Sequence, residues 1–208
     1  YEWNTILLAY DLIDYFKYNP AAVPDSVTLN IIPVANPDGL EEVTGKTDRF
    51  DVEDLAADTL PGRWNGNEVD LNRNWDCNWQ EMGTWRDRPV SGGSEVFSQP
   101  ETKILKELFL QTQPVAVIFL HSAADGVFAS GCPDTHQPSM ALASVYGVAA
   151  GYPIYERFSA YEVTGDAGDW LSQQEIASIS VELIDHIYQV RDFRQNLAGM
   201  LAVLNQYQ

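Results

Sequence analysis

Two polar side chains stand at the ends of apolar segments, where they could do chemistry. His121 follows the apolar run 115–120, and Glu182 lies near the end of the apolar run 176–183. A buried carboxylate is costly unless it is paired or bound to a metal ion, so the position of Glu182 favours a functional role. A single histidine in such a place is either a metal ligand or a satisfied core residue. His136 and His186 do not stand at a strand end beside other polar groups, and we interpret them as structural.

A polar block, Asp70-Leu71-Asn72-Arg73-Asn74-Trp75, offers a second kind of chemistry. An arginine beside an amide presents the fork of donors that binds a free carboxylate. The same block can also be a loop held by Asn and Asp turns. Three further residues also have two interpretations each, a functional and a simple structural one. Structurally, Glu2 can be a first-turn helix acid, Arg63 a solvated charge and Tyr161 a surface aromatic.

The elements that must position these residues alternate between helices and strands. Apolar residues at helical spacing predict a helix over 3–16, which Asn19-Pro20 ends. Apolar and β-branched runs predict buried strands at 26–32, 115–120 and 176–183. Further helices are predicted from Ser98-Gln99-Pro100-Glu101 onward, over 138–150 and over 193–204. This alternation indicates an α/β protein, in which sites form at the carboxyl ends of strands.

Between the first two predicted strands the chain is rich in turn signals. Asn36-Pro37-Asp38-Gly39 predicts a turn directly after the strand at 26–32. Residues 40–98 are predicted to be mostly irregular, with many Gly, Asp, Trp and Arg residues. A loop region of this length inside a compact domain is usually functional.

Composition excludes several classes of function. The net charge of -18 repels phosphate backbones, so nucleic acid is not expected as a partner. No apolar run approaches the roughly 20 residues of a membrane-spanning helix, so no membrane partner is expected either. The chain has no Gly-x-Ser-x-Gly motif, which argues against a serine hydrolase of the α/β type. The count of two cysteines does not decide between free thiols and a disulfide.

The order of the motifs resembles one enzyme family. Along the chain stand, in this order, Glu2-Trp3-Asn4-Thr5, Asn36 to Gly39, Arg63, Val69 to Trp75, Ser98 to Thr102, His121-Ser122, Tyr161 with Gly165, Asp169-Trp170 and Glu182-Leu183. This pattern resembles the zinc carboxypeptidases of the carboxypeptidase A type, peptidase family M14. The resemblance implies an α/β fold, a three-layer α/β/α sandwich around a mixed sheet. It also implies one catalytic domain over 1–208 that lacks the first strands of the family domain, and therefore a fragment.

The resemblance implies a metal site that holds one zinc ion. The family binds zinc with a His-x-x-Glu pair and a later histidine. Glu2 matches the glutamate of the pair and His121 the later histidine, whereas the first histidine would lie upstream of Tyr1. Asp70 matches the aspartate that orients that first histidine. We therefore expect this chain alone to bind zinc poorly, as an inactive or apo fragment.

The resemblance also implies how a substrate is held and cleaved. Glu182 matches the catalytic glutamate, and Arg63 the arginine that polarises the scissile carbonyl group. Asn72 and Arg73 match the pair that binds the terminal carboxylate, and Tyr161 the mobile tyrosine that closes over the substrate. A carboxylate that takes a proton from zinc-bound water fits this division of roles. The implied activity is removal of C-terminal residues from peptides, by a chain that acts as a monomer.

Two alternative functions remain open beside this one. The first is that of an amidase of the same family that acts on cell-wall peptides. The second is that of a catalytically inactive domain that binds ligands in the same cleft.

Two further expectations concern Asp166 and the cysteines. Asp166 either points a carboxylate into the pocket for the last side chain, which favours C-terminal Lys or Arg, or caps the Asp169-Trp170 turn. Cys77 follows the Asn72-Arg73 block, and Cys132 follows the His121 strand. Both cysteines should therefore lie in loops at the same end of the sheet. We expect a Cys77–Cys132 disulfide and therefore a secreted or extracytoplasmic protein.

Overall fold

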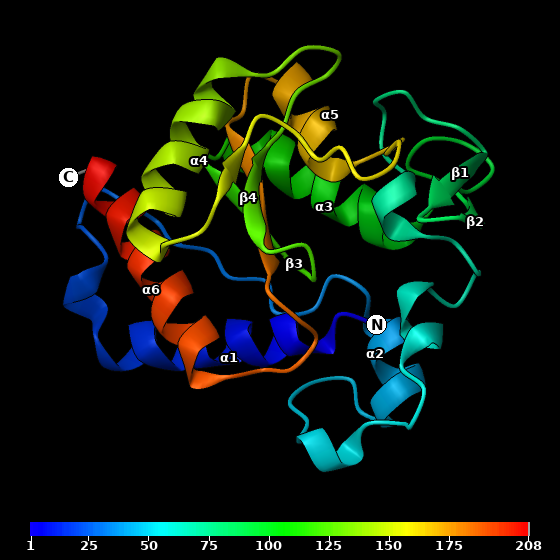
Figure 1. Ribbon diagram of the computed structural model, residues 1–208, viewed down its shortest axis with the longest axis horizontal. Coiled ribbons are helices and arrows are strands. Elements are labelled where there is room, and N and C mark those ends of the chain that lie inside the picture. Colours follow the sequence, from blue (N-terminus) through cyan, green and yellow to red (C-terminus); the bar gives the residue numbers. More distant parts are fainter. Residues whose placement is uncertain (208) are drawn as a thin grey trace.

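A four-stranded mixed sheet forms the centre of the computed structural model, which describes residues 1–207 (Figure 1). The strands are β3 (Val117–Ser122), β4 (Gly126–Ala129), β5 (Ile154–Tyr155) and β6 (Ser178–Leu183), in the order β3-β6-β4-β5. β6 pairs in parallel with β3 and antiparallel with β4, and β4 pairs in parallel with β5. The two longer strands confirm the predictions at 115–120 and 176–183, with starts about two residues later.

Helices cover both faces of this sheet, which makes the predicted three-layer α/β/α sandwich. Alternate side chains of β3 face opposite ways. Ile118 and Leu120 join the core formed with α1 (Trp3–Tyr18), α4 (Gln137–Ala150) and α6 (Val190–Leu204). Val117 and Phe119 join the second core, with α3 (Pro100–Thr112) and α5 (Ala167–Gln173). Because a strand points successive side chains to opposite faces, one apolar strand serves both cores.

The region before α3 is less irregular than predicted. Asn36 accepts a hydrogen bond from the backbone N–H of Gly39 and so caps α2 (Pro37–Thr44), which ends at Gly45 in the left-handed conformation. The predicted turn is therefore the first turn of a helix, because Asn before Pro is also a strong helix start. Short 3-10 helices and a hairpin of β1 (Met82–Trp85) and β2 (Arg88–Ser91) follow.

The predicted strand at 26–32 is wrong in this structure. The segment is extended, and its side chains alternate: those of Val27, Leu29 and Ile31 are half-buried, whereas those of 28, 30 and 32 are exposed. The backbone groups of residues 28–33 form no hydrogen bond with any described residue. A strand requires a partner strand, and within residues 1–207 none lies beside this segment.

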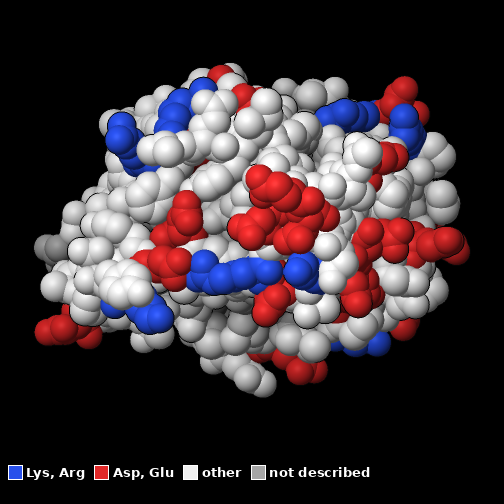
Figure 2. Space-filling model, turned by 90° about the horizontal axis from the view of Figure 1, so that it is seen from below, with Lys and Arg blue, Asp and Glu red and all other residues white. Residues whose placement is uncertain are grey.

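A disulfide joins the loop after the Asn72-Arg73 segment to the loop that follows β4. Cys77 and Cys132 are bonded, with a Cα–Cα distance of 6.4 Å, as predicted. Among the described residues no helix is both long enough and apolar enough to span a bilayer. One face of the molecule carries several groups of acidic side chains with basic side chains between them (Figure 2), in keeping with the strongly negative net charge.

Candidate active site

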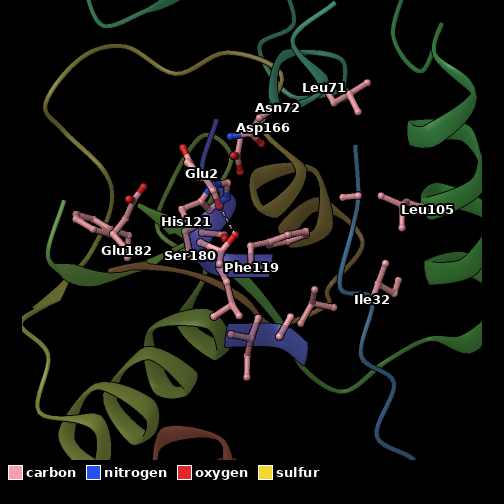
Figure 3. Close-up of a pocket in the computed structure, with 18 of the residues that line it drawn as sticks. Glu2, Ile32, Leu71, Asn72, Leu105, Phe119, His121, Asp166, Ser180 and Glu182 are labelled. Carbon is pink, nitrogen blue, oxygen red and sulfur yellow. Dashed lines mark hydrogen bonds and ion pairs between the residues drawn. The ribbon is translucent and has the colours of Figure 1, made fainter. Parts of the chain in front are cut away.

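His121 and Glu182 are direct neighbours in the sheet. They are register partners near the carboxyl ends of the parallel strands β3 and β6. Glu2, which directly precedes α1, lies beside them, and Figure 3 shows the three side chains together at one cavity. Residues from three distant parts of the chain thus meet, because helix-linked parallel strands end at the same edge of a sheet.

Glu2 and His121 are in direct contact. One carboxylate oxygen of Glu2, Oε2, lies 3.0 Å from His121 Nδ1 and accepts a hydrogen bond of 3.2 Å from the backbone N–H of Ser122. Burial alone would lower the pKa of His121, but the Glu2 carboxylate outweighs it and raises this pKa to about 9. Burial likewise opposes ionisation of Glu2, but His121 and Arg63 hold its pKa below the usual value. Glu2 and His121 therefore form an ion pair at neutral pH.

The carboxyl group of Glu182 has a pKa near neutral pH. Burial raises the pKa of its carboxyl group to about 7, and the negative charge of Glu2 adds to this effect. His121, Arg63 and a backbone hydrogen bond from Ala124 act in the opposite direction. A carboxyl group with this pKa exchanges a proton readily at physiological pH, as a general base must.

Arg63 contacts Asp70, Glu2 and Trp85. Its Nη2 donates to the carboxylate of Asp70 at 2.6 Å, its Nη1 lies 4.0 Å from Glu2 Oε1, and its guanidinium stacks 4.2 Å from the ring centre of Trp85. Its Nε is buried and has no hydrogen-bond partner among the described residues. Asp70, which was expected to orient a histidine, thus pairs with Arg63 within the described chain.

Arg73 is only 1% exposed, although it was expected to bind a substrate carboxylate. Its Nε and Nη2 donate to the carbonyl of Thr84, and its Nη1 donates to the carbonyl of Asn72. A guanidinium has five N–H donors, so two remain after these backbone contacts, and the Tyr161 hydroxyl hydrogen-bonds to this guanidinium. Asn72, Arg73 and Tyr161 all line the cavity that holds Glu182, and burial raises the pKa of the Tyr161 hydroxyl.

Asp166 caps α5, which was one of its two expected roles. Its Oδ1 accepts a hydrogen bond of 3.0 Å from the backbone N–H of Asp169, whose own carboxylate accepts one of 2.9 Å from Gly131. Burial and the neighbouring charge of Asp166 raise the pKa of Asp169 to about 7. Both carboxyl groups also line the cavity, so capping does not remove them from the site.

His186 lies closer to the site than its position in the sequence indicated. Its Nδ1 is 3.0 Å from Ser122 Oγ and its Nε2 is 3.2 Å from the Tyr1 hydroxyl. Ser122 Oγ donates in turn to the buried Asn4. This network supports the turn after His121, which is a structural role. No sequence signal marks it, because His186 follows β6 in a loop and its partners come from distant segments.

The described residues do not complete a metal site of the expected kind. Nitrogen and oxygen donors such as Glu2 and His121 suit zinc, and a catalytic zinc usually has three protein ligands. Within residues 1–207, however, no group of three or more His, Cys, Asp or Glu side chains could hold a metal ion. Glu2 and His121 supply two donors, which bond to one another.

Comparison with known families decides where this arrangement belongs. A sequence model described as zinc carboxypeptidase matches residues 4–190. The chain belongs to the zinc carboxypeptidase family. The family assignment that the motif order indicated is thereby confirmed.

Several known proteins resemble the chain. It is 31% identical over 137 residues to murein peptide amidase A of Vibrio campbellii, a match that covers 61% of this chain and 52% of that protein. Bovine thrombin-activatable fibrinolysis inhibitor, solved with a tick carboxypeptidase inhibitor, superposes with a TM-score of 0.72 at 21% identity, over 98% of this chain and 76% of that chain. Murein-tripeptide amidase MpaA of Escherichia coli O157 superposes with a TM-score of 0.59 at 23% identity, over 83% of this chain and 66% of that chain.

These structural matches confirm the fold. The chain spans about half the length of murein peptide amidase A and about two thirds of murein-tripeptide amidase MpaA. The activity and substrates of the whole protein are therefore matters for proposal.

Proposed function

We propose that the protein is a zinc-dependent metallocarboxypeptidase that hydrolyses the last peptide bond of peptides and proteins. One observation carries the proposal: a carboxyl group with a pKa of about 7, Glu182, opens into the same cavity as the Glu2–His121 pair and Arg73. The first two features suit water activation, and the third suits recognition of a carboxylate. The partners are peptide C-termini, and no nucleic acid or membrane is involved.

The proposed metal site needs one donor beyond the described residues. Glu2 and His121 supply two ligands, and the third would be a histidine three residues before Glu2. Zinc, when bound, lowers the pKa of a coordinated water toward neutrality. Because two ligands hold zinc weakly, we expect the 208-residue chain by itself to bind zinc poorly and to have low activity or none.

The chain's own residues would share the remaining work. Glu182 accepts a proton from the attacking water and passes it to the leaving amine. Arg63, held by Asp70 and Trp85 beside Glu2, stabilises the oxygen that becomes negative. Arg73, with Asn72, binds the terminal carboxylate, and Tyr161, which hydrogen-bonds to Arg73 in this structure, closes over the substrate.

A comparison of matched peptides tests this proposal. The protein with the third metal ligand present, a histidine three residues before Glu2, is supplied with excess zinc and assayed on a peptide with a free C-terminus and on the same peptide with an amidated C-terminus. We expect release of the last residue from the free peptide alone. Glu182→Gln keeps the shape of the side chain but cannot accept the proton, so it should lower the rate by about 10²–10⁴-fold.

The same assay separates the alternatives. Carboxylate-dependent binding without turnover, measured by calorimetry, would favour an inactive binding domain. Equal cleavage of both peptides would contradict carboxypeptidase action, and full activity of Glu182→Gln would contradict the role of Glu182.

A second candidate keeps the chemistry and changes the substrate. The relative from Vibrio campbellii is named a murein peptide amidase, which favours cell-wall peptides as substrates. Cleavage of murein tripeptide in preference to the linear peptide would support this candidate.

A finer proposal concerns the last side chain of the substrate. Asp166 and Asp169 would attract a basic side chain, so we propose a preference for C-terminal Lys or Arg over Glu or Asp.

The Cys77–Cys132 disulfide supports secretion or an extracytoplasmic location, because such bonds persist in oxidising compartments.

A further inference from the structure

Strand β1 of the hairpin lies beside both arginines of the candidate site. Its residues alternate in exposure: Met82 and Thr84 are exposed, whereas Gly83 and Trp85 are buried. Each of the two buried positions lies against a different arginine side chain. The strand therefore links two arginines to which the proposed function gives different roles.

Hydrogen bonds alone do not fix the plane of the Arg63 guanidinium. Its Nη2 donates to Asp70, but its Nη1 is 4.0 Å from Glu2 Oε1, and its buried Nε has no hydrogen-bond partner among the described residues. The guanidinium carbon lies 4.2 Å from the ring centre of Trp85. A cation over an indole ring is attracted by the electrons of the ring. Asp70 thus holds one end of the guanidinium, and Trp85 restrains its plane.

The ring of Trp85 is itself held in place. Trp85 is only 5% exposed, and its backbone pairs with Arg88 of β2. The ring of Tyr1 meets the Trp85 ring edge-on, with 5.1 Å between the ring centres. The guanidinium of Arg86 lies 5.0 Å from the centre of the Trp85 ring. With these neighbours the indole is a fixed surface for Arg63.

The backbone of the same strand holds the second arginine. The carbonyl of Thr84 accepts hydrogen bonds from Nε and Nη2 of Arg73, at 3.0 and 2.9 Å. Two donors of one planar group on one acceptor fix the direction in which the group points. A Cβ atom at Gly83 would lie 3.1 Å from Arg73 Cδ and 2.9 Å from Thr164 Oγ1. A larger residue at position 83 would therefore displace one of these side chains.

The hairpin is also bonded to the segment from Asp70 to Asn74. The backbone N–H of Asp70 donates to the carbonyl of Ser91 in β2 at 2.9 Å, and the side chain of Asn74 donates to the carbonyl of Gly92 at 2.6 Å. The carboxylate of Asp70 in turn accepts from Arg63. The hairpin, this segment and both arginines are thus connected by direct contacts, so a shift of β1 would move both guanidinium groups.

We propose that strand β1 is a positioning element for both arginines. Trp85 sets the plane of Arg63. Gly83 and the Thr84 carbonyl set the direction of Arg73. The inference rests on the proposed function, in which one arginine stabilises the developing negative oxygen and the other binds the terminal carboxylate. Loss of an interaction made only in the transition state lowers kcat, whereas loss of one made equally with bound substrate raises KM.

Two substitutions on β1 test this separation of effects. Both are made in the protein with the third metal ligand present and are assayed with excess zinc on the peptide with a free C-terminus. Trp85→Leu should lower kcat by about tenfold and change KM by less than about twofold, because the plane of Arg63 is no longer held. Gly83→Ala should raise KM by about tenfold and change kcat by less than about twofold, because the added methyl group displaces Arg73.

Two further variants distinguish positioning from a general loss of structure. Trp85→Tyr keeps an aromatic ring for the guanidinium and should retain most of kcat. Met82→Thr changes a side chain of the same strand that is 56% exposed, and it should leave both constants unchanged. Equal losses of kcat in the tyrosine and leucine variants, or an unchanged KM in Gly83→Ala, would overturn the proposal.

A measurement without turnover separates this proposal from the proposed function. In the NMR spectrum of the 208-residue chain, the Nε–H proton of Arg63 should have a ring-current shift that Trp85→Leu removes and Met82→Thr retains. The Nε–H of Arg73 should exchange with water about tenfold faster in Gly83→Ala. If these effects were present and no peptide were cleaved, the proposed function would be wrong and the positioning by β1 supported. Cleavage without these effects would contradict the positioning alone.

Discussion

Glu182 and Asp169 both line the cavity and both have a pKa of about 7. In each case burial is the largest cause, and a second carboxylate adds to it: Glu2 for Glu182 and Asp166 for Asp169. The two groups differ in what they contact. Glu182 adjoins His121 in the sheet at the cavity, whereas Asp169 anchors the loop at Gly131.

Asp169→Asn should become increasingly stabilising, relative to the natural protein, as the pH rises. The folded pKa of about 7 lies above the ordinary 3.8, so the folded state holds the proton more tightly and stability falls as the pH rises between these values. Asparagine keeps an acceptor for the Gly131 N–H and has no proton to lose. Urea unfolding at pH 4 and pH 8 should show a relative gain of at least about 1.4 kcal/mol at the higher pH.

Asp134→Asn, on the exposed surface, controls for the loss of one negative charge. A stability difference between Asp169→Asn and the natural protein that stays constant across this pH range would contradict the assignment.

At the scale of elements, short polar side chains decide where two helices begin. Asn36 caps α2 and Asp166 caps α5, each by accepting from a backbone N–H three residues later. The first N–H groups of a helix have no partner within the helix, so such acceptors fix its start. These caps also place functional segments, because α5 carries the Asp169-Trp170 pair, and Asp169 lines the cavity.

Asp166→Ala and Asp166→Asn should differ in stability by about 1 kcal/mol, with alanine the less stable. Both substitutions remove the charge that repels Asp169, but only asparagine can still accept from the Asp169 N–H. Chemical unfolding of the two variants at one pH measures the cap alone. If both variants were equally stable, the cap would have no energetic role.

At the scale of the whole molecule, one covalent bond ties distant loops together at the site. Cys77 follows the segment that carries Asn72 and Arg73, and Cys132 follows β4, at a separation of 55 residues. The backbone of this region also bonds across, since Gly165 donates to the carbonyl of Cys77 and accepts from Trp75. The disulfide therefore stabilises the wall of the cavity that carries Arg73.

Replacing both cysteines with serine should lower the free energy of unfolding by about 4 kcal/mol in the chain-entropy model. This is a large share of the roughly 5–15 kcal/mol that stabilises a typical domain. Denaturant unfolding of the double variant, compared with the natural chain in its oxidised and reduced forms, measures the effect. A loss below about 1 kcal/mol relative to the oxidised chain would show that the loops hold their places without the bond.

Much of the fold and site was predictable because the signals are local. The apolar runs that become β3 and β6, and the helices α1, α3 and α4, are recognisable within their own residues. The block from Asp70 to Trp75 is also recognisable in the sequence, but its residue types alone left open whether it binds a carboxylate or is a loop held by Asn and Asp turns, so its role stays a prediction. The start of α6 was predicted three residues late, because Gln189 and Asp192 cap it through side chains that have no apolar signal.

By itself, the amino-acid sequence determined which residues alternate, where the four longer helices form and which polar groups stand at strand ends, because spacing along one segment decides these. Only the tertiary structure decided which residues and backbone segments contact one another. Residues 26–32 have the composition of a strand and yet are not one, because pairing depends on backbone from elsewhere. Asp70 binds Arg63, and the pKa of Glu182 rises to about 7, because burial and charge come from segments that only folding brings together.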